Sequence, residues 1–252
     1  MTTVAFIGLG IMGGPMAANL VKAGFEVVGH NRSADKVQAL VDAGGRGAGS
    51  VAEAVRDADV IITMVPDSPD VEAVATGEDG IFASARTGAL YIDMSTIRPD
   101  VAVRVAEAGR KAGLRVLDAP VSGGEAGAIE ANLSIMVGGE ADDFAAARPV
   151  LDAVGKTIVH VGPSGAGQTV KAANQLIVAV NIEVLAEAVV FLEAYGVDTK
   201  AAMEVLGGGL AGSKVLDQKR ENMLSRSFQR VGVGKRASSG GCFVTADFGS
   251  AR

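Results

Sequence analysis

The sequence predicts an α/β protein in which a doubly wound sheet is followed by a smaller all-helical domain. Three observations predict this fold. Short runs rich in Val and Ile alternate with helical patterns up to about residue 162, a glycine-rich turn joins the first strand to the first helix, and a long apolar helical stretch follows. We therefore expect a dinucleotide-binding domain over residues 1–162, an incomplete helical domain over residues 163–229 and an irregular tail over residues 230–252.

Each element of the first domain has a local signal. Pro15 suits the first turn of the first helix, Ser33 and Ser50 can cap the next two, and Ser68 can cap the helix after Pro66. Runs of β-branched and other apolar residues predict strands over residues 4–7, 26–29, 60–64, 90–94, 114–118, 133–137 and 157–161. Helical patterns lie between them, including residues 14–23, 99–112 and 141–154.

The region after residue 162 is predicted to be helical. A loop over residues 163–167 precedes a helix that runs to Tyr195 and ends at Gly196. Because this helix is apolar nearly all round, we expect it to be buried along much of its length. Two shorter helices are expected near residues 199–206 and 213–226, whereas the Gly- and Ser-rich tail has no clear period.

Composition excludes several function classes. The chain has 252 residues and a net charge of −6 without a basic cluster, so nucleic acid is not an expected partner. A single cysteine, Cys242, excludes an intramolecular disulfide and a multi-cysteine metal site, and no metal is expected. Asn181, Glu183 and Glu187 interrupt the apolar run over residues 176–192, so we expect no membrane span and a cytoplasmic protein.

A glycine-rich motif follows the first predicted strand and opens a helix. The motif has the spacing GxGxxG and consists of Gly8, Leu9, Gly10, Ile11, Met12 and Gly13. Gly8 permits a tight turn, Gly10 lets the backbone approach a pyrophosphate, and Gly13 lets the helix pack closely on the strand. The helix N-terminus adds free N–H groups and partial positive charge. The motif predicts a dinucleotide site, the alternative being a glycine-rich turn without a ligand.

The end of the second predicted strand indicates which dinucleotide is bound. An NAD-selective site usually has an acid here, but the chain has Asn31, Arg32 and Ser33. Arg32 can pair with a 2′-phosphate, and its neighbours can donate hydrogen bonds to it. We predict that NADP(H) is preferred and that NAD(H) is possible. The alternative is that Arg32 is a solvated surface residue.

Loops after later strands are expected at the same crevice, because ligands of such sheets bind outside the carboxyl ends of the strands. Val65 and Pro66 follow one of these strands and Thr96 follows the next. Thr96 is placed to approach a nicotinamide, or alternatively to cap a helix.

Lys171 and Asn174 lie three residues apart near the start of the long helix and share one of its faces. A carbonyl that accepts hydride develops negative charge on oxygen, which a lysine ammonium can stabilise and protonate. The alternative for Lys171 is an exposed helix lysine. Upstream, Ser122, Gly123 and Gly124 form a loop whose hydroxyl and backbone N–H groups suit a carboxylate, unless Ser122 is only a helix cap.

Four segments together resemble a known family. They are FIGLGIMG at residues 6–13, DMST at 93–96, DAPVSGG at 118–124 and GQTVKAANQ at 167–175. In order and spacing they are similar to motifs of the β-hydroxyacid dehydrogenases, the family related to 3-hydroxyisobutyrate dehydrogenase. Within it they look closest to the tartronate semialdehyde (2-hydroxy-3-oxopropionate), glyoxylate and succinic semialdehyde reductases. The resemblance covers about residues 3–229.

The resemblance implies a Rossmann-like domain, a helical domain built on a long helix, and homo-oligomers formed through the helical part. It implies that Lys171 is the general acid in reduction and that Asn174 assists it. It also implies that Ser122, Gly123 and Gly124 hold a substrate carboxylate, and that Val65, Pro66 and Thr96 match cofactor-contacting positions. A small carboxylate-bearing aldehyde is therefore the expected substrate, with oxidation of 3-hydroxyisobutyrate by NAD as the alternative.

The chain departs from the family pattern after Gln229. Members of the family continue into further helices that carry a Lys-Asp pair and close the cleft, whereas here the sequence turns into the Gly- and Ser-rich tail. We interpret this C-terminus as aberrant or truncated, and a changed reading frame near Gln229 is our hypothesis for its origin. A dinucleotide-binding but inactive protein is therefore a further alternative.

Overall fold

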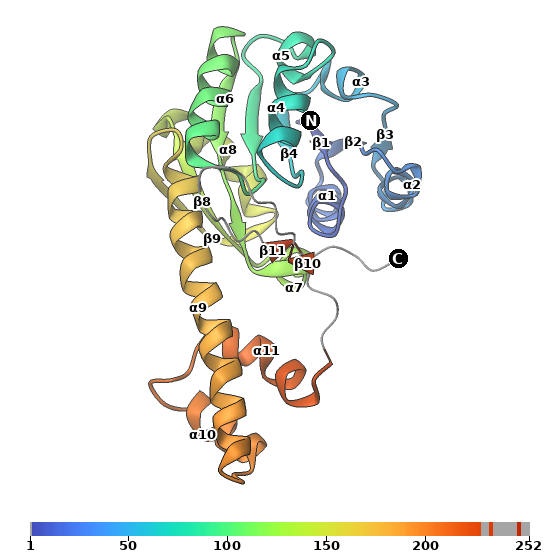
Figure 1. Ribbon diagram of the computed structural model, residues 1–252. Coiled ribbons are helices and arrows are strands. Elements are labelled where there is room, and N and C mark those ends of the chain that lie inside the picture. The colour runs from blue at the N-terminus through green and yellow to red at the C-terminus, as the bar shows by residue number, and fades with distance from the viewer. Residues whose placement is uncertain (1, 228–231, 234–245, 248–252) are drawn as a thin grey trace. The chain divides into compact units, whose positions relative to one another are not determined.

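The computed structural model describes residues 2–227, 232–233 and 246–247 (Figure 1). The chain divides into two compact units, Met1–Lys171 and Ala172–Arg252. The division lies inside the long helix, later than the boundary at residue 162 expected from the sequence. In the tail, β10 (Gly232–Val233) pairs antiparallel with β11 (Ala246–Asp247). The other residues of the tail, 230–231, 234–245 and 248–252, lie outside the described ones.

A nine-stranded sheet forms the centre of the first unit. Six strands are parallel and lie in the order β3-β2-β1-β4-β5-β6, followed by β8 and β7, and β9 pairs with β8. The strands are β1 (Thr3–Ile7), β2 (Glu26–His30), β3 (Arg46–Gly47), β4 (Val60–Thr63), β5 (Leu90–Asp93), β6 (Arg115–Asp118), β7 (Val121–Ser122), β8 (Leu133–Gly139) and β9 (Gly155–Gly162). The strand order reverses between β1 and β4, which confirms the doubly wound fold and places the expected ligand crevice there.

Helices cover both faces of this sheet (Figure 1). Alternate residues of β1 enter different cores, since Val4 and Phe6 pack into one and Ala5 and Ile7 into the other. The first core is covered by α1 (Gly13–Lys22), α2 (Ala34–Asp42), α7 (Gly124–Ile129) and α8 (Ala141–Asp152). The second is covered by α3 (Val51–Val55), α4 (Ser68–Thr76), α5 (Ile81–Ser84) and α6 (Pro99–Lys111). Strands buried on both faces explain the continuous apolar runs in the sequence.

The helical unit has a small core of its own. Helices α9 (Ala166–Ala194), α10 (Thr199–Gly207) and α11 (Lys214–Ser225) meet at Leu185, Val189, Met203 and Leu216. Much of α9 is nevertheless exposed, including Leu176, Ile177, Val180, Val184, Val190 and Phe191. The expectation that this helix is buried along much of its length is therefore wrong for the described chain, because two short helices cover only part of it. By length and composition alone α9 could cross a membrane, a test that core helices also pass.

Candidate active site

The glycine turn between β1 and α1 has the geometry of a pyrophosphate cradle. Gly8 has a φ of +99°, and a side chain there would collide with the backbone carbonyl of Met64. A side chain at Gly13 would collide with the carbonyl of Gly8, so the helix can pack this closely only with glycine. The space beside Gly10 is open, and no described side chain caps the N-terminus of α1. An open turn facing an uncapped helix end fits the phosphates of a dinucleotide.

The end of β2 lines a cavity of about 480 Å³ beside this turn. Asn31 lies in its wall, and its side-chain oxygen accepts a hydrogen bond from the Leu9 backbone N–H at 3.0 Å. The Asn31 amide group therefore fastens the glycine turn to β2. Ser33 occupies the N-cap position of α2, as expected, although its side chain makes no capping hydrogen bond.

Arg32 points into solvent at the rim of the same cavity. Its side chain is 85% exposed, and it forms an ion pair with the Asp70 carboxylate on α4 at 3.9 Å. An exposed pair at this distance contributes little to stability, so the guanidinium remains available to another anion. Contact between Arg32 and a 2′-phosphate stays a prediction.

The loops after β4 and β5 are joined by short polar contacts. The Val65 backbone N–H donates to the Ser95 hydroxyl at 3.0 Å, and the Ser95 N–H donates to Asp93 at 3.1 Å. These contacts bring the segment containing Val65 and Pro66 beside the one containing Thr96. Thr96 is half-buried, and α6 begins at Pro99, so the alternative that Thr96 caps this helix is wrong.

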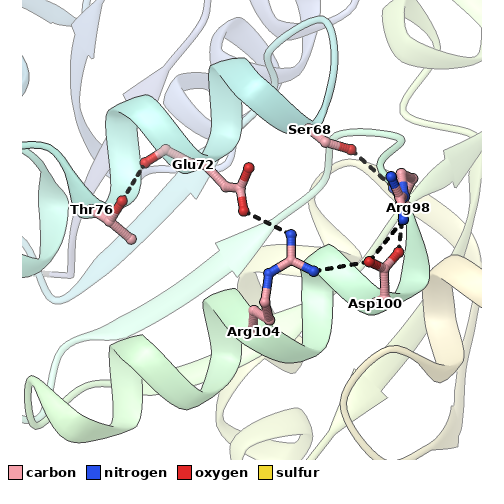
Figure 2. A network of polar contacts seen from close by, with 6 residues as sticks. All are labelled: Ser68, Glu72, Thr76, Arg98, Asp100 and Arg104. Carbon is pink, nitrogen blue, oxygen red and sulfur yellow. Dashed lines mark hydrogen bonds and ion pairs between the residues drawn. The ribbon is translucent and has the colours of Figure 1, made fainter. Parts of the chain in front are cut away.

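A second set of contacts joins α4 to the end of the loop after β5 and to α6 (Figure 2). Ser68 was expected to cap α4, but it is the first residue of that helix, and its hydroxyl accepts from the Arg98 backbone N–H at 3.1 Å. Arg104 on α6 bridges Glu72 on α4 at 2.9 Å and Asp100 at 2.8 Å. The loop after β5 is thus tied to the first turn of α4 by a bond that no local pattern could predict.

Lys171 is buried, with 7% of its surface exposed. Its ammonium nitrogen donates to the backbone carbonyl oxygen of Val121 at 2.7 Å. Burial disfavours the charged form and lowers the pKa of Lys171 to about 8. The alternative that Lys171 is an ordinary exposed helix lysine is therefore wrong.

The loop expected to hold a carboxylate begins one residue after Val121. Ser122 belongs to β7 and pairs with Ser134 of β8. Gly123 occupies the N-cap position of α7 with a φ of +145°, and Gly124 has a φ of +66°. Ser122 is therefore not the cap of α7, and the two glycines adopt backbone conformations that other residues rarely take.

Asn174 follows Lys171 by three residues but belongs to the second unit. It is half-buried, and its amide nitrogen donates to the side-chain oxygen of Gln175 at 3.0 Å. Its assistance to Lys171 stays a prediction.

Two buried polar side chains of this site were not assigned roles from the sequence. Asp118, at the end of β6, accepts from the backbone N–H groups of Gly165 and Gln168 at 2.7 and 2.9 Å, and so anchors the start of α9. Burial raises the pKa of Asp118. The Gln168 side chain contacts the loop after β5. Asp118 could have been recognised as a site residue because it is a polar residue at the end of a buried strand. Gln168 carried no such signal beyond its place in the motif at residues 167–175.

Comparison with known proteins agrees with this geometry. Residues 3–162 match the NAD binding domain of 6-phosphogluconate dehydrogenase, and residues 165–232 match the NAD-binding domain of NADP-dependent 3-hydroxyisobutyrate dehydrogenase. The chain is 44% identical over 227 residues to 2-hydroxy-3-oxopropionate reductase of Escherichia coli, covering 89% of this chain and 77% of that protein. The chain belongs to the β-hydroxyacid dehydrogenase family.

Two other members of the β-hydroxyacid dehydrogenase family are similarly close. The 3-hydroxyisobutyrate dehydrogenase of Pseudomonas aeruginosa is 43% identical over 217 residues, covering 86% of this chain and 73% of its own length. The solved structure of Mycobacterium tuberculosis 3-hydroxyisobutyrate dehydrogenase with L-serine is 40% identical, with a TM-score of 0.79 over 85% of this chain and 73% of that one. The chain is thus an oxidoreductase of this family with a nicotinamide dinucleotide cofactor. Contact between this cofactor and the turn at Gly8 and Gly10 stays a prediction, with which the open geometry of the turn agrees.

Proposed function

We propose that this β-hydroxyacid dehydrogenase reduces a small carboxylate-bearing aldehyde, of the tartronate semialdehyde, glyoxylate or succinic semialdehyde type, with Lys171 as the general acid. The observation that carries the proposal is the buried ammonium of Lys171, which is held by the Val121 carbonyl one residue before Ser122. The residue proposed as proton donor and the loop proposed to bind the carboxylate therefore adjoin within one unit of the protein.

The protein's part in the reaction is to orient the substrate and supply a proton. When bound, the reduced nicotinamide cofactor supplies the hydride that adds to the aldehyde carbon. Lys171 donates its proton to the carbonyl oxygen, so the aldehyde becomes the hydroxyacid and the lysine becomes neutral, while loss of the hydride leaves the cofactor oxidised. A pKa of about 8 suits this task, because the group is mostly protonated at neutral pH yet gives up its proton readily. Asn174, one helical turn further along, assists.

The loop of Ser122, Gly123 and Gly124 holds the substrate carboxylate in this proposal. Positive φ angles at both glycines turn backbone N–H groups in directions that an ordinary helix start does not offer. Fixing the carboxylate fixes the position of the substrate's carbonyl group relative to the Lys171 ammonium, and such positioning accounts for a large part of catalysis.

NADP(H) is the proposed cofactor, with NAD(H) also possible. The end of β2 has no acid to accept the hydrogen bonds of a ribose 2′-hydroxyl, and the exposed Arg32 lies at the rim of the adjoining cavity. The description of the family matched by residues 165–232, which names an NADP-dependent enzyme, also supports this choice.

Oxidation of a β-hydroxyacid such as 3-hydroxyisobutyrate is the second candidate. Relatives with this name are as similar to the chain as the reductase is. The pKa of Lys171 also supports it, since a lysine that loses its proton near pH 8 can accept one from an alcohol at mildly alkaline pH.

The test combines cofactor binding with turnover. NADPH and NADH are titrated by fluorescence. The three aldehydes and 3-hydroxyisobutyrate are assayed with the parent chain, with Lys171→Met and with Lys111→Met, a matched control at an exposed position of α6. We expect Lys171→Met to bind NADPH normally and to lose about 100-fold or more in kcat, the usual worth of a general acid, while Lys111→Met stays active. Equal rates in the parent and Lys171→Met would refute the role of Lys171. NADPH binding without turnover in the parent would select the inactive alternative.

A further inference from the structure

Gln168 contacts the backbone on both sides of Thr96. Its side chain is 1% exposed, its amide nitrogen donates to the Ser95 carbonyl oxygen at 2.7 Å, and its amide oxygen accepts from the Ile97 N–H at 3.1 Å. Such a pair of bonds needs a donor and an acceptor on one planar group, which an amide provides. The segment in which Thr96 is expected to face the nicotinamide is therefore attached to α9.

The same turn of α9 is attached to β6 and β7. The Gln168 backbone N–H donates to the Asp118 carboxylate at 2.9 Å, and Lys171, three residues later, donates to the Val121 carbonyl at 2.7 Å. Gly167 lies so close to Asp118 that no larger residue would fit. This helical turn is thus attached to the loop after β5, to Asp118 of β6 and to Val121 of β7. All three attachments lie within the first unit. A turn held this way has little freedom to move against the loop after β5.

We propose that Gln168 is a positioning residue, which sets the distance between the Thr96 loop and the turn of α9 that carries Lys171. This rests on the proposed function, because it concerns the spacing between the nicotinamide-facing loop and the proton donor. Hydride and proton must reach the two atoms of one carbonyl group, so a shift of this loop against Lys171 impairs turnover even where both binding sites survive. In this proposal Gln168 also keeps Lys171 buried, with 7% of its surface exposed, by holding the first turn of α9 in place.

Asn19 provides a matched control. It is a second buried amide that bridges backbone groups of another element, since its nitrogen donates to the carbonyls of Ala128 and Ile129 at 2.8 and 3.3 Å. It joins α1 to α7 and contacts none of the proposed catalytic groups. Asn19→Leu and Gln168→Leu remove comparable contacts, so a purely structural role predicts comparable effects from both.

The experiment compares Gln168→Leu, Gln168→Glu and Asn19→Leu with the parent. Gln168→Glu keeps the acceptor for Ile97 but loses the donor to Ser95 when ionised, and it serves if the leucine variant does not fold. We expect both Gln168 variants to lose about tenfold or more in kcat per folded molecule, with the KM for NADPH changed less than about threefold. We expect Asn19→Leu to lower the melting temperature without changing kcat. Unchanged kcat in folded Gln168 variants would overturn the proposal.

A second readout needs no turnover, and so separates this proposal from the proposed function. Trace labelling with acetic anhydride across about pH 7 to 11, read by peptide mass spectrometry, reports the titration of Lys171 in the cofactor-free chain. In the Gln168 variants we expect the midpoint to move upward, because water reaches the ammonium, and in Asn19→Leu to stay unchanged. If Lys171→Met is as active as the parent, the proposed function fails. The role of Gln168 is then tested by the labelling alone, and an unchanged titration midpoint of Lys171 in the Gln168 variants overturns it.

Discussion

The ammonium nitrogen of Lys171 lies 2.7 Å from the backbone carbonyl oxygen of Val121. This carbonyl accepts a hydrogen bond from the ammonium but carries no full charge, so it orients the ammonium without offsetting the cost of burying its charge. This is why the pKa of Lys171 falls to about 8. A carboxylate in place of the carbonyl would have stabilised the charged form and raised the pKa.

The pH dependence of the two reaction directions should be opposite. Aldehyde reduction needs protonated Lys171, so its kcat/KM should fall as pH rises through about 8. Hydroxyacid oxidation needs the neutral amine, so its kcat/KM should rise over the same interval. Steady-state rates in both directions from about pH 6 to 10 measure this. Lys171→Arg stays charged throughout, so it should show neither the fall in reduction nor the rise in oxidation. Identical pH profiles in the two directions would contradict the assignment of Lys171 as the titrating group.

Removing the buried charge should stabilise the protein at neutral pH. The folded-state pKa of Lys171 is about 8 and the ordinary value is 10.5, so the unfolded chain binds the proton more tightly. Burial of Lys171 therefore costs stability below about pH 8, and the cost disappears as pH rises toward 10.5. We expect Lys171→Met to raise the free energy of unfolding at pH 7 by about 1–3 kcal/mol, after the loss of one hydrogen bond. Urea denaturation at pH 7 and at about pH 10 checks this, and a gain that does not shrink at the higher pH counts against it.

Removing the buried charge of Asp93 should also stabilise the protein, but here the gain should grow as pH rises. Asp93 is buried beside Thr63 and Ser95, and burial raises its pKa to about 6. Because the folded-state pKa lies above the unfolded 3.8, stability falls as pH rises from about 4 to about 6, and the full cost of burying Asp93 is present above about pH 6. Asp93→Asn keeps an acceptor for Thr63 and Ser95, and we expect a gain of about 1–2 kcal/mol at pH 7.5 that vanishes near pH 4. Thermal unfolding across this range measures it, and a destabilised variant at pH 7.5 would be the contrary result.

Arg32 should decide the preference between the two cofactors. If its guanidinium binds a 2′-phosphate, Arg32→Ala should raise the Kd for NADPH about tenfold or more and leave that for NADH unchanged, since a charged hydrogen bond contributes about 1.5–3 kcal/mol. Arg46→Ala is the control, because Arg46 is a similarly exposed arginine that pairs with Glu26. Equal effects on both cofactors, or on both variants, would remove Arg32 from the 2′-phosphate site.

The acid opposite Arg32 should act against NADPH. The Asp70 carboxylate pairs with this guanidinium at 3.9 Å. Its negative charge competes with a phosphate for Arg32, and it also repels the phosphate directly. Asp70→Asn should therefore tighten NADPH binding, more at low salt than at high salt, and should leave NADH binding unchanged. Fluorescence titrations at two ionic strengths test this, and a salt-independent effect would point to another cause.

Much of the fold could be predicted because its signals are local. Ser50 accepts from the Glu53 N–H as a capping residue should, and the buried runs of β1, β4 and β5 were all recognisable. The two-residue strands β3 and β7 and the short helices α5 and α7 were not, because so few residues show no period. The exposure of α9 was also mispredicted, because an apolar composition does not tell which neighbours cover a helix.

The sequence by itself determined the order of strands and helices and the glycine turn, and it singled out Lys171 as the candidate proton donor, because period, backbone freedom and side-chain chemistry belong to neighbouring residues. Only the tertiary structure decided that Lys171 is buried and titrates near pH 8, that Ser68 bonds to Arg98 rather than capping its helix, and that Gln168 holds the Thr96 loop. Desolvation and hydrogen bonding depend on segments that are far apart in the chain and meet only when it folds.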